Sequence, residues 1–158
     1  MKISVLASGS KGNCTFVEVN GTKLLIDIGI SHARLTKELE KINVDPQAID
    51  AVLITHSHSD HVCGLDVLCK NYNIDIYAMP KLVKKISNGR EVFVPYKEQY
   101  EINNVSIHVI KTSHDCPDSV GFIIDNRLVY ITDTGYLHQK YFDVLKNNPE
   151  FLTDNPKC

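Results

Sequence analysis

Residues 55–61 read Thr-His-Ser-His-Ser-Asp-His and follow directly on the apolar run Ala51-Val52-Leu53-Ile54. Histidine is the commonest transition-metal ligand, and carboxylate is the usual second choice. Side chains two residues apart in an extended segment point the same way, so His56 and His58 can face one metal ion. Asp60 and His61 come after the chain starts to turn and can face a second position nearby. The stretch therefore predicts a metal site at the end of a strand; the alternative, a solvated polar loop, would suit a single histidine better than this cluster.

The length and composition of the chain indicate one globular domain. It has 158 residues, of which 43% are hydrophobic and 23% charged, so there is enough apolar material for a core. The formal net charge is −2, which provides no overall basic field to attract nucleic acid. A polyanionic substrate would have to be held by a local patch or by metal.

The cysteines and the N-terminus indicate the compartment. There are five cysteines, an odd number, and no pair is spaced as CxxC. The sequence opens straight into a strand without a signal peptide, so we expect a cytoplasmic protein with free thiols. No apolar run approaches the roughly 20 residues that a membrane span requires. Cys63 and Cys116, close in sequence to the proposed ligands, are expected to be small buried hydrophobic residues.

The apolar pattern predicts strands alternating with helices. Asn20-Gly21 is a strong hairpin signal, and Ser31 has the character of a helix N-cap. We expect strands over 2–7, 15–19, 23–27, 51–55, 74–78, 91–94, 100–102, 105–111, 120–125 and 128–132, and helices over 31–42, 61–72, 80–86 and 138–146. A single domain over 1–146 is expected to be followed by an irregular tail over 147–158. Polar clusters at the strand ends favour a mixed α/β layered fold with its site there.

Two further strands are predicted to end in residues of the metal-binding type. His114 follows the strand predicted over 105–111, and Asp133 follows the strand predicted over 128–132. With the motif at 55–61, three separate strands therefore end in candidate ligands. Convergence of such ends at one edge of a sheet would build a metal site.

The ordered set resembles the motifs of the metallo-β-lactamase superfamily. The matching residues are Asp27 (motif one), His56, His58, Asp60 and His61 (motif two), His114 (motif three) and Asp133 (motif four). The resemblance implies an αββα sandwich, of which this chain would hold the N-terminal portion with an incomplete second half. Residues 8–13, 113–115 and 132–136 are similar to the YycJ/WalJ-like branch, bacterial proteins described as DNA exonucleases.

The resemblance also implies roles for individual residues. His56, His58 and His114 would hold one divalent metal ion, Asp60 and His61 a second, and Asp133 would bridge both. Asp27 would not touch metal but would steady the ligand loop. The two metals would activate a water molecule for attack on phosphorus, and Asp60 would orient that nucleophile as the catalytic residue. Zinc suits such a histidine-rich site, while manganese or iron are the alternatives.

The sequence departs from the superfamily pattern after Asp133. Superfamily members usually add further strands and helices and a final histidine that completes the second metal position. The one histidine remaining here is His138, for which a solvated helix face is the better interpretation. We therefore expect the second metal site to be weak or empty, and the chain to be a truncated product or a homodimer that covers the missing half.

Two groups of residues are candidates for contacting substrate. Ser10 and Asn13 could hydrogen-bond a substrate phosphate or the metal-bound water, although turn chemistry explains them almost as well. Lys81, Lys84, Lys85 and Arg90 form a basic group that could contact phosphates, with a solvated helix face as the alternative.

Three functional hypotheses follow. The leading one is a metal-dependent phosphodiesterase acting on nucleic acid as a DNA exonuclease, with DNA as the partner and no membrane association. The second is a small-molecule metallohydrolase of the thioester type. The third is a metal-binding or interaction remnant with little or no catalytic activity.

Overall fold

The first of two sheets holds the N-terminal half of the chain. The computed structural model describes residues 1–82, 93–95, 97–137, 139–141, 146 and 150–153. The sheet has six strands in chain order: β1 (Lys2–Ala7), β2 (Cys14–Val19), β3 (Thr22–Ile26), β4 (Ala51–Leu53), β5 (Asp75–Ala78) and β6 (Phe93–Pro95). β1 to β3 pair antiparallel, whereas β3 to β6 pair parallel. The carboxyl ends of β3, β4 and β5 therefore lie at one edge.

The second sheet is built from the rest of the chain. Its strand order is β11-β8-β9-β10-β12, with β7 also paired to β8. The strands are β7 (Gln99–Ile102), β8 (Val105–Ser113), β9 (Val120–Ile124), β10 (Leu128–Ile131), β11 (Tyr136–Leu137) and β12 (Glu150–Thr153). β12 runs parallel to β10, and the other pairs are antiparallel.

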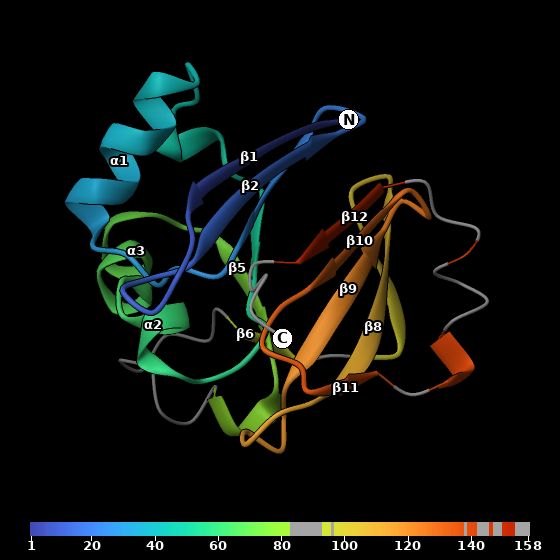
Figure 1. The fold of residues 1–158 in the computed structure, drawn as a ribbon. Helices are drawn as coiled ribbons and strands as arrows, with labels where there is room; N and C mark the ends of the chain where they lie inside the picture. The colour runs from blue at the N-terminus through green and yellow to red at the C-terminus, as the bar shows by residue number, and fades with distance from the viewer. Residues whose placement is uncertain (83–92, 96, 138, 142–145, 147–149, 154–158) are drawn as a thin grey trace.

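Helices cover the outer face of the first sheet (Figure 1). They are α1 (His32–Lys41), α2 (Ser59–Val62) and α3 (Leu65–Asn71), with a 3-10 turn η1 at Pro46–Ala48. Leu35 and Leu39 of α1 and Leu65 and Leu68 of α3 are buried in one hydrophobic cluster with the sheet. Helical spacing of these leucines is what places them on a single face.

A second cluster fills the space between the two sheets. Val17, Leu24 and Leu53 of the first sheet share it with Phe122 and Tyr130 of the second. Alternate residues of each strand reach it because strand side chains point to opposite faces. The layers are thus helices, sheet and sheet, and a third cluster lies on the far face of the second sheet: Ile110, Ile123, Val129, Ile131 and the partly buried Tyr141. The predicted α/β sandwich is confirmed.

Two predicted local signals are confirmed. Asn20 and Gly21 both have positive φ, 52° and 83°, as the two-residue hairpin between β2 and β3 requires. The Ser31 side chain accepts a hydrogen bond from the backbone N–H of Arg34 and caps α1. Sequence signals that act over a few residues therefore hold well here.

The predicted single helix over 61–72 is wrong. The chain forms α2 and α3 instead, separated at Cys63 and Gly64. Gly64 lies so close to the segment between β3 and α1 that a Cβ on residue 64 would be 2.1 Å from the backbone oxygen of Ile30. The interruption between α2 and α3 therefore coincides with a tertiary contact, which the spacing of apolar residues along the sequence cannot predict.

The C-terminal predictions also need correction. The predicted irregular tail over 147–158 contains β12, which extends the second sheet through backbone pairing with β10. Of the helix predicted over 138–146, the structure describes the 3-10 turn η2 at Gln139–Tyr141 and the helical Lys146, and the remaining positions lie outside the described residues. Strand pairing at a sheet edge depends on a partner distant in sequence, so local composition did not reveal it. His138, Lys84, Lys85, Arg90 and most of the helix predicted over 80–86 lie outside the described residues.

Candidate metal centre

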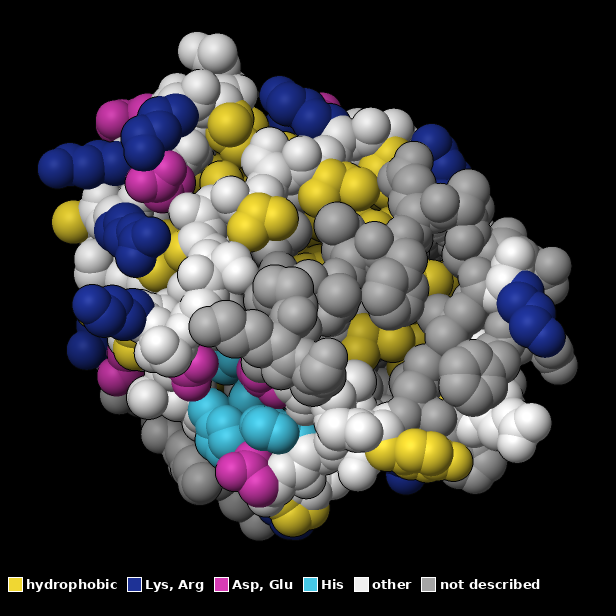
Figure 2. All heavy atoms as spheres, in the orientation of Figure 1, with side chains coloured by type: hydrophobic (Ala, Val, Ile, Leu, Met, Phe, Trp, Pro, Cys, Tyr) yellow, Lys and Arg dark blue, Asp and Glu magenta, His cyan; other side chains and the backbone are white. Residues whose placement is uncertain are grey.

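The predicted ligands meet where strands of both sheets end. Residues 54–61 follow β4, His114 follows β8, and Asp133 follows β10. β11 pairs with the end of β8, Tyr136 opposite Ser113, which brings the loop of Asp133 alongside His114. Figure 2 shows the histidine side chains gathered in one surface patch with acidic side chains beside it. Convergence of three strand ends, as the sequence predicts, is what the structure contains.

Three histidines form the first group that could hold a metal ion. One nitrogen each from His56, His58 and His114 lies within 4.8 Å of the others. His114 Nε2 is 3.2 Å from His58 Nδ1. The centroid of the His56 ring lies 4.6 Å from that of the His58 ring and 4.9 Å from that of the His114 ring. Imidazole nitrogens directed at one point are a ligand set typical of zinc and related ions.

A second group shares His56 with the first. It contains His56, His61 and Asp133, again with ligand atoms within 4.8 Å. Asp133 Oδ2 is 2.8 Å from His61 Nε2 and 3.8 Å from His56 Nε2. The Asp133 carboxylate thus lies between the two rings.

Asp27 and Thr55 orient the two histidines of this second group. The buried Asp27 carboxylate accepts from Thr55 at two atoms, the backbone N–H at 2.8 Å and Oγ1 at 2.7 Å. The same Oδ2 lies 2.7 Å from His61 Nδ1, and Thr55 Oγ1 lies 3.0 Å from His56 Nδ1. In the neutral form of either ring these contacts favour the proton on Nδ1, which leaves the Nε2 lone pair directed into the cluster.

The donors fit a metal ion. His56 Nε2 is buried and has no hydrogen-bond partner among the described residues, although a buried polar atom normally has one. Burial, followed by the nearby charge of His61, lowers the pKa of His56 to about 4, so its ring is neutral at physiological pH. A neutral, oriented and unpaired imidazole nitrogen is what a metal ligand requires.

The backbone itself is constrained at two of the carboxylates. Asp27 and Asp133 both adopt left-handed conformations, with φ of 59° and 46°. Non-glycine residues are uncommon in this region, although Asp and Asn tolerate it better than most. Each turns the chain sharply at the end of its strand, β3 and β10, and so aims its carboxylate inward.

Asp60 and Asn13 lie beside His61. Asp60 Oδ2 is 3.6 Å from His61 Nε2, and Asp60 belongs to neither ligand group among the described residues. The Asn13 amide nitrogen lies 3.0 Å from His61 Nε2 and donates to Asp60 Oδ2 at 3.3 Å. The Gly9 N–H donates to Asn13 Oδ1, which fixes the orientation of the amide. Asn13 therefore links the loop after β1 to the ligands, whereas Ser10 is exposed in that loop.

Sequence reasoning missed Thr55 and Asp115. The Thr55 hydroxyl contacts both the Asp27 carboxylate and His56 Nδ1. Asp115 Oδ1 lies 3.0 Å from His114 Nε2 and 3.4 Å from His58 Nε2. Each is next to a predicted ligand in sequence, and this adjacency is the sequence feature that could have indicated their roles.

The prediction that Cys63 and Cys116 are buried is wrong, since Cys63 is exposed and Cys116 half-buried. Both lie in connecting segments between helices or strands, where apolar surroundings are incomplete.

Comparison with known proteins identifies the class. Residues 7–145 match the family model described as the metallo-beta-lactamase superfamily, and the chain belongs to that superfamily. Among solved structures, a diphosphatase from the PhnP family superposes with a TM-score of 0.74 at 16% identity, over 94% of this chain and 72% of that one. At that identity the likeness shows the fold alone.

Curated relatives are more similar in sequence. Exodeoxyribonuclease WalJ of Streptococcus pneumoniae serotype 2 is 35% identical over 97% of this chain and 61% of its own length. Exodeoxyribonuclease YycJ of Bacillus anthracis is 28% identical over 98% of this chain and 62% of its own. The chain thus spans about three fifths of the length of these relatives.

Two broader properties complete the description. Within the described part of the chain, no helix has the length and apolar character needed to cross a lipid bilayer. Cys14, Cys63, Cys69 and Cys116 form no disulfide bond within the described part of the chain.

The Asp27–His61 contact leads to a pH-dependent prediction. Burial alone would lower the pKa of His61, but the hydrogen bond and charge of Asp27 outweigh it and raise the value from 6.5 to about 9. The protonated ring therefore stabilises the metal-free fold below about pH 6.5, and this stabilisation is lost as pH rises through 9. Metal binding at the second group must displace this proton, so metal affinity there should rise with pH up to about 9.

Calorimetry in buffers of different ionisation enthalpy would measure the protons released on metal binding. We expect about one proton per chain at pH 7 from His61 and almost none above pH 10. Asp27→Asn should weaken metal binding by about 10- to 100-fold, since partners of ligands typically contribute that much, while the exposed Asp75→Asn should leave it unchanged. Metal uptake at pH 7 without proton release would contradict this assignment.

Proposed function

We propose that this chain is a metal-dependent phosphodiesterase that cleaves DNA as an exonuclease. The observation that carries the proposal is the pair of ligand groups sharing His56, one of three histidines and one of two histidines with Asp133. The names of the relatives, exodeoxyribonucleases at 35% and 28% identity, support DNA as the substrate. A cytoplasmic location agrees with the absence of disulfide bonds among the described cysteines. That the chain forms a homodimer covering the missing half of the fold stays a prediction.

In this proposal His56, His58 and His114 hold one divalent metal ion, and His61 and Asp133 contribute to a second. Zinc is the ion that the histidine-rich donors favour, with manganese or iron as alternatives where carboxylate takes part. Such ions supply Lewis-acid polarisation of the phosphoryl oxygens and lower the pKa of a water molecule. Asp27 and Thr55 keep the imidazoles of His56 and His61 in the tautomer that leaves Nε2 available.

Asp60 is the residue proposed to act on the nucleophile. Its side chain is 31% exposed, and its Oδ2 lies 3.6 Å from His61 Nε2. There it can accept a hydrogen bond from the attacking water and orient it. Asn13 donates to the same Oδ2, which holds the carboxylate in place.

Asp60→Asn tests this role. The amide keeps the shape but removes the negative charge that strengthens the hydrogen bond to the attacking water, so we expect DNA degradation to fall by at least about 100-fold while metal remains at the three-histidine group. A DNA degradation assay alongside metal content by mass spectrometry would measure both, with the exposed Asp66→Asn as the matched control. Unchanged DNA cleavage by Asp60→Asn would remove Asp60 from the mechanism, and activity of the wild type on a thioester but not on DNA would overturn the proposed function.

A further inference from the structure

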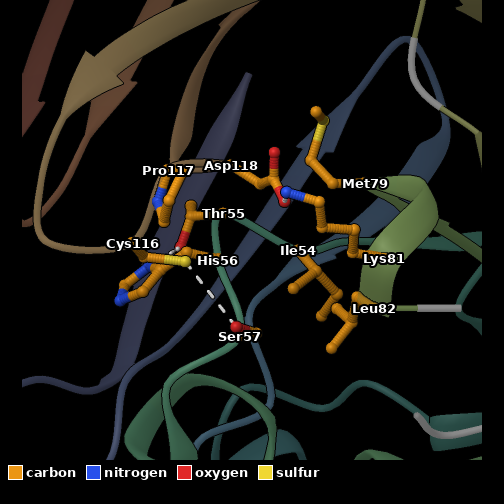
Figure 3. A pocket seen from close by; sticks show the side chains of 10 residues that line it. All are labelled: Ile54, Thr55, His56, Ser57, Met79, Lys81, Leu82, Cys116, Pro117 and Asp118. Atoms are coloured by element: carbon orange, nitrogen blue, oxygen red, sulfur yellow. Dashed lines mark hydrogen bonds and ion pairs between the residues drawn. The ribbon is translucent and has the colours of Figure 1, made fainter. Parts of the chain in front are cut away.

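A cavity adjoins the metal centre on the side of Ser57 and is not used by the mechanism above. Its volume is about 150 Å³. Three segments enclose it: residues 54–57 after β4, residues 79–82 after β5, and residues 116–118 between β8 and β9 (Figure 3). His56 lines this cavity and also belongs to both ligand groups, so the cavity and the metal centre share a wall.

The cavity has apolar walls and a polar rim. Ile54, Met79, Leu82 and Pro117 supply the apolar surface. Concave apolar pockets with a few placed polar groups are the usual form of small-molecule sites. This composition favours a flat, weakly polar group over a phosphate or a sugar.

Two contacts across the cavity supply the polar rim. Lys81 Nζ lies 3.2 Å from Asp118 Oδ2, and Ser57 Oγ lies 3.6 Å from Cys116 Sγ, as the close view shows (Figure 3). Lys81 is 75% exposed and Asp118 26%, so both can still reach a bound molecule from the rim. A carboxylate accepts from an exocyclic amine of the cytosine type, and an ammonium donates to a ring carbonyl.

The volume limits what can enter. An apolar cavity of about 150 Å³ accepts a single six-membered ring such as benzene. A pyrimidine base has one such ring, whereas a purine adds a second fused ring. We propose that this cavity receives the pyrimidine base of the nucleotide whose phosphodiester lies at the metal centre. The inference rests on the proposed function for its substrate and adds a base preference to it.

Nucleotide binding can be measured without any turnover. Backbone amide shifts of the isotope-labelled chain, titrated with dCMP and with dAMP, report both the affinity and the residues affected. We expect dCMP to bind at least about tenfold tighter than dAMP, with the largest shifts in residues 54–57, 79–82 and 116–118. Equal affinities, or dCMP shifts confined to other segments, would overturn the proposal.

Filling the cavity provides the second arm. Leu82→Phe adds a ring to its wall, and Cys116→Met is measured if Leu82→Phe does not fold. We expect the filled variant to bind dCMP at least about tenfold more weakly but to bind inorganic phosphate, which has no ring, and to hold metal as the wild type does. Undiminished dCMP binding by the filled variant would contradict the base pocket. Absence of phosphodiester hydrolysis by the wild type would instead contradict the proposed function, and the nucleotide titration would still decide the pocket.

Discussion

His56→Gln is expected to abolish both metal sites and to lower DNA hydrolysis by more than about 100-fold. Residues that merely orient ligands typically contribute 10- to 100-fold to metal affinity or activity, and His56 is a candidate ligand in both groups. Its side chain is fully buried, and its Nε2 has no hydrogen-bond partner among the described residues. Metal content by mass spectrometry and DNA degradation would be measured on the same sample.

His108→Gln is the matched control. His108 lies on β8 opposite Gln99, belongs to neither ligand group, and is half-buried. We expect its metal content and activity to equal those of the wild type. If His56→Gln retained two metals per chain, the arrangement of shared ligands proposed above would be wrong.

Gly29→Ala is expected to have the largest effect on stability. A Cβ at residue 29 would lie 1.6 Å from the backbone oxygen of Asp60 and 2.5 Å from the backbone nitrogen of Asn13. Both neighbours are backbone atoms in hydrogen bonds: Asn13 N–H donates to Asp60 O at 2.8 Å, and Gly29 N–H donates to Asn13 O at 2.8 Å. The clash would therefore have to move the ligand loop itself.

We expect Gly29→Ala to lower the free energy of unfolding by about 3 kcal/mol or more, at the upper end of overpacking effects. Urea unfolding followed by circular dichroism would measure it. Gly135→Ala is the control, because the nearest atom to its Cβ would be the Ser113 oxygen at 4.0 Å, and its stability should change by less than about 0.5 kcal/mol. Equal stability of Gly29→Ala and the wild type would show that these loops are not packed as described.

The candidate ligands could be predicted because they are concentrated in a short stretch and at strand ends. His56, His58 and His61 fall within one short stretch after an apolar strand, and His114 and Asp133 each end a strand. The order and spacing of these residues resemble one superfamily, which the match over residues 7–145 shows. Strong periodicity also predicted α1 and most strands to within a few residues.

What the sequence did not reveal depends on contacts between distant segments. Thr55 is an ordinary polar residue in the motif until Asp27, which lies 28 positions earlier, is seen to hold it. The break between α2 and α3 follows from the close approach of Gly64 to Ile30, and β12 follows from the open edge of β10. These contacts cannot be predicted from the helical spacing of apolar residues or from local composition.

The metal centre is tested most directly by locating a bound ion. Crystals grown with zinc would be measured at the zinc absorption edge, so that anomalous scattering shows where the ion is bound. We expect one peak enclosed by His56, His58 and His114 and a second, with lower occupancy if that site is the weaker, beside His61 and Asp133. Zinc bound elsewhere on the chain, with no anomalous peak among these five residues, would contradict the central claim that they form a metal centre.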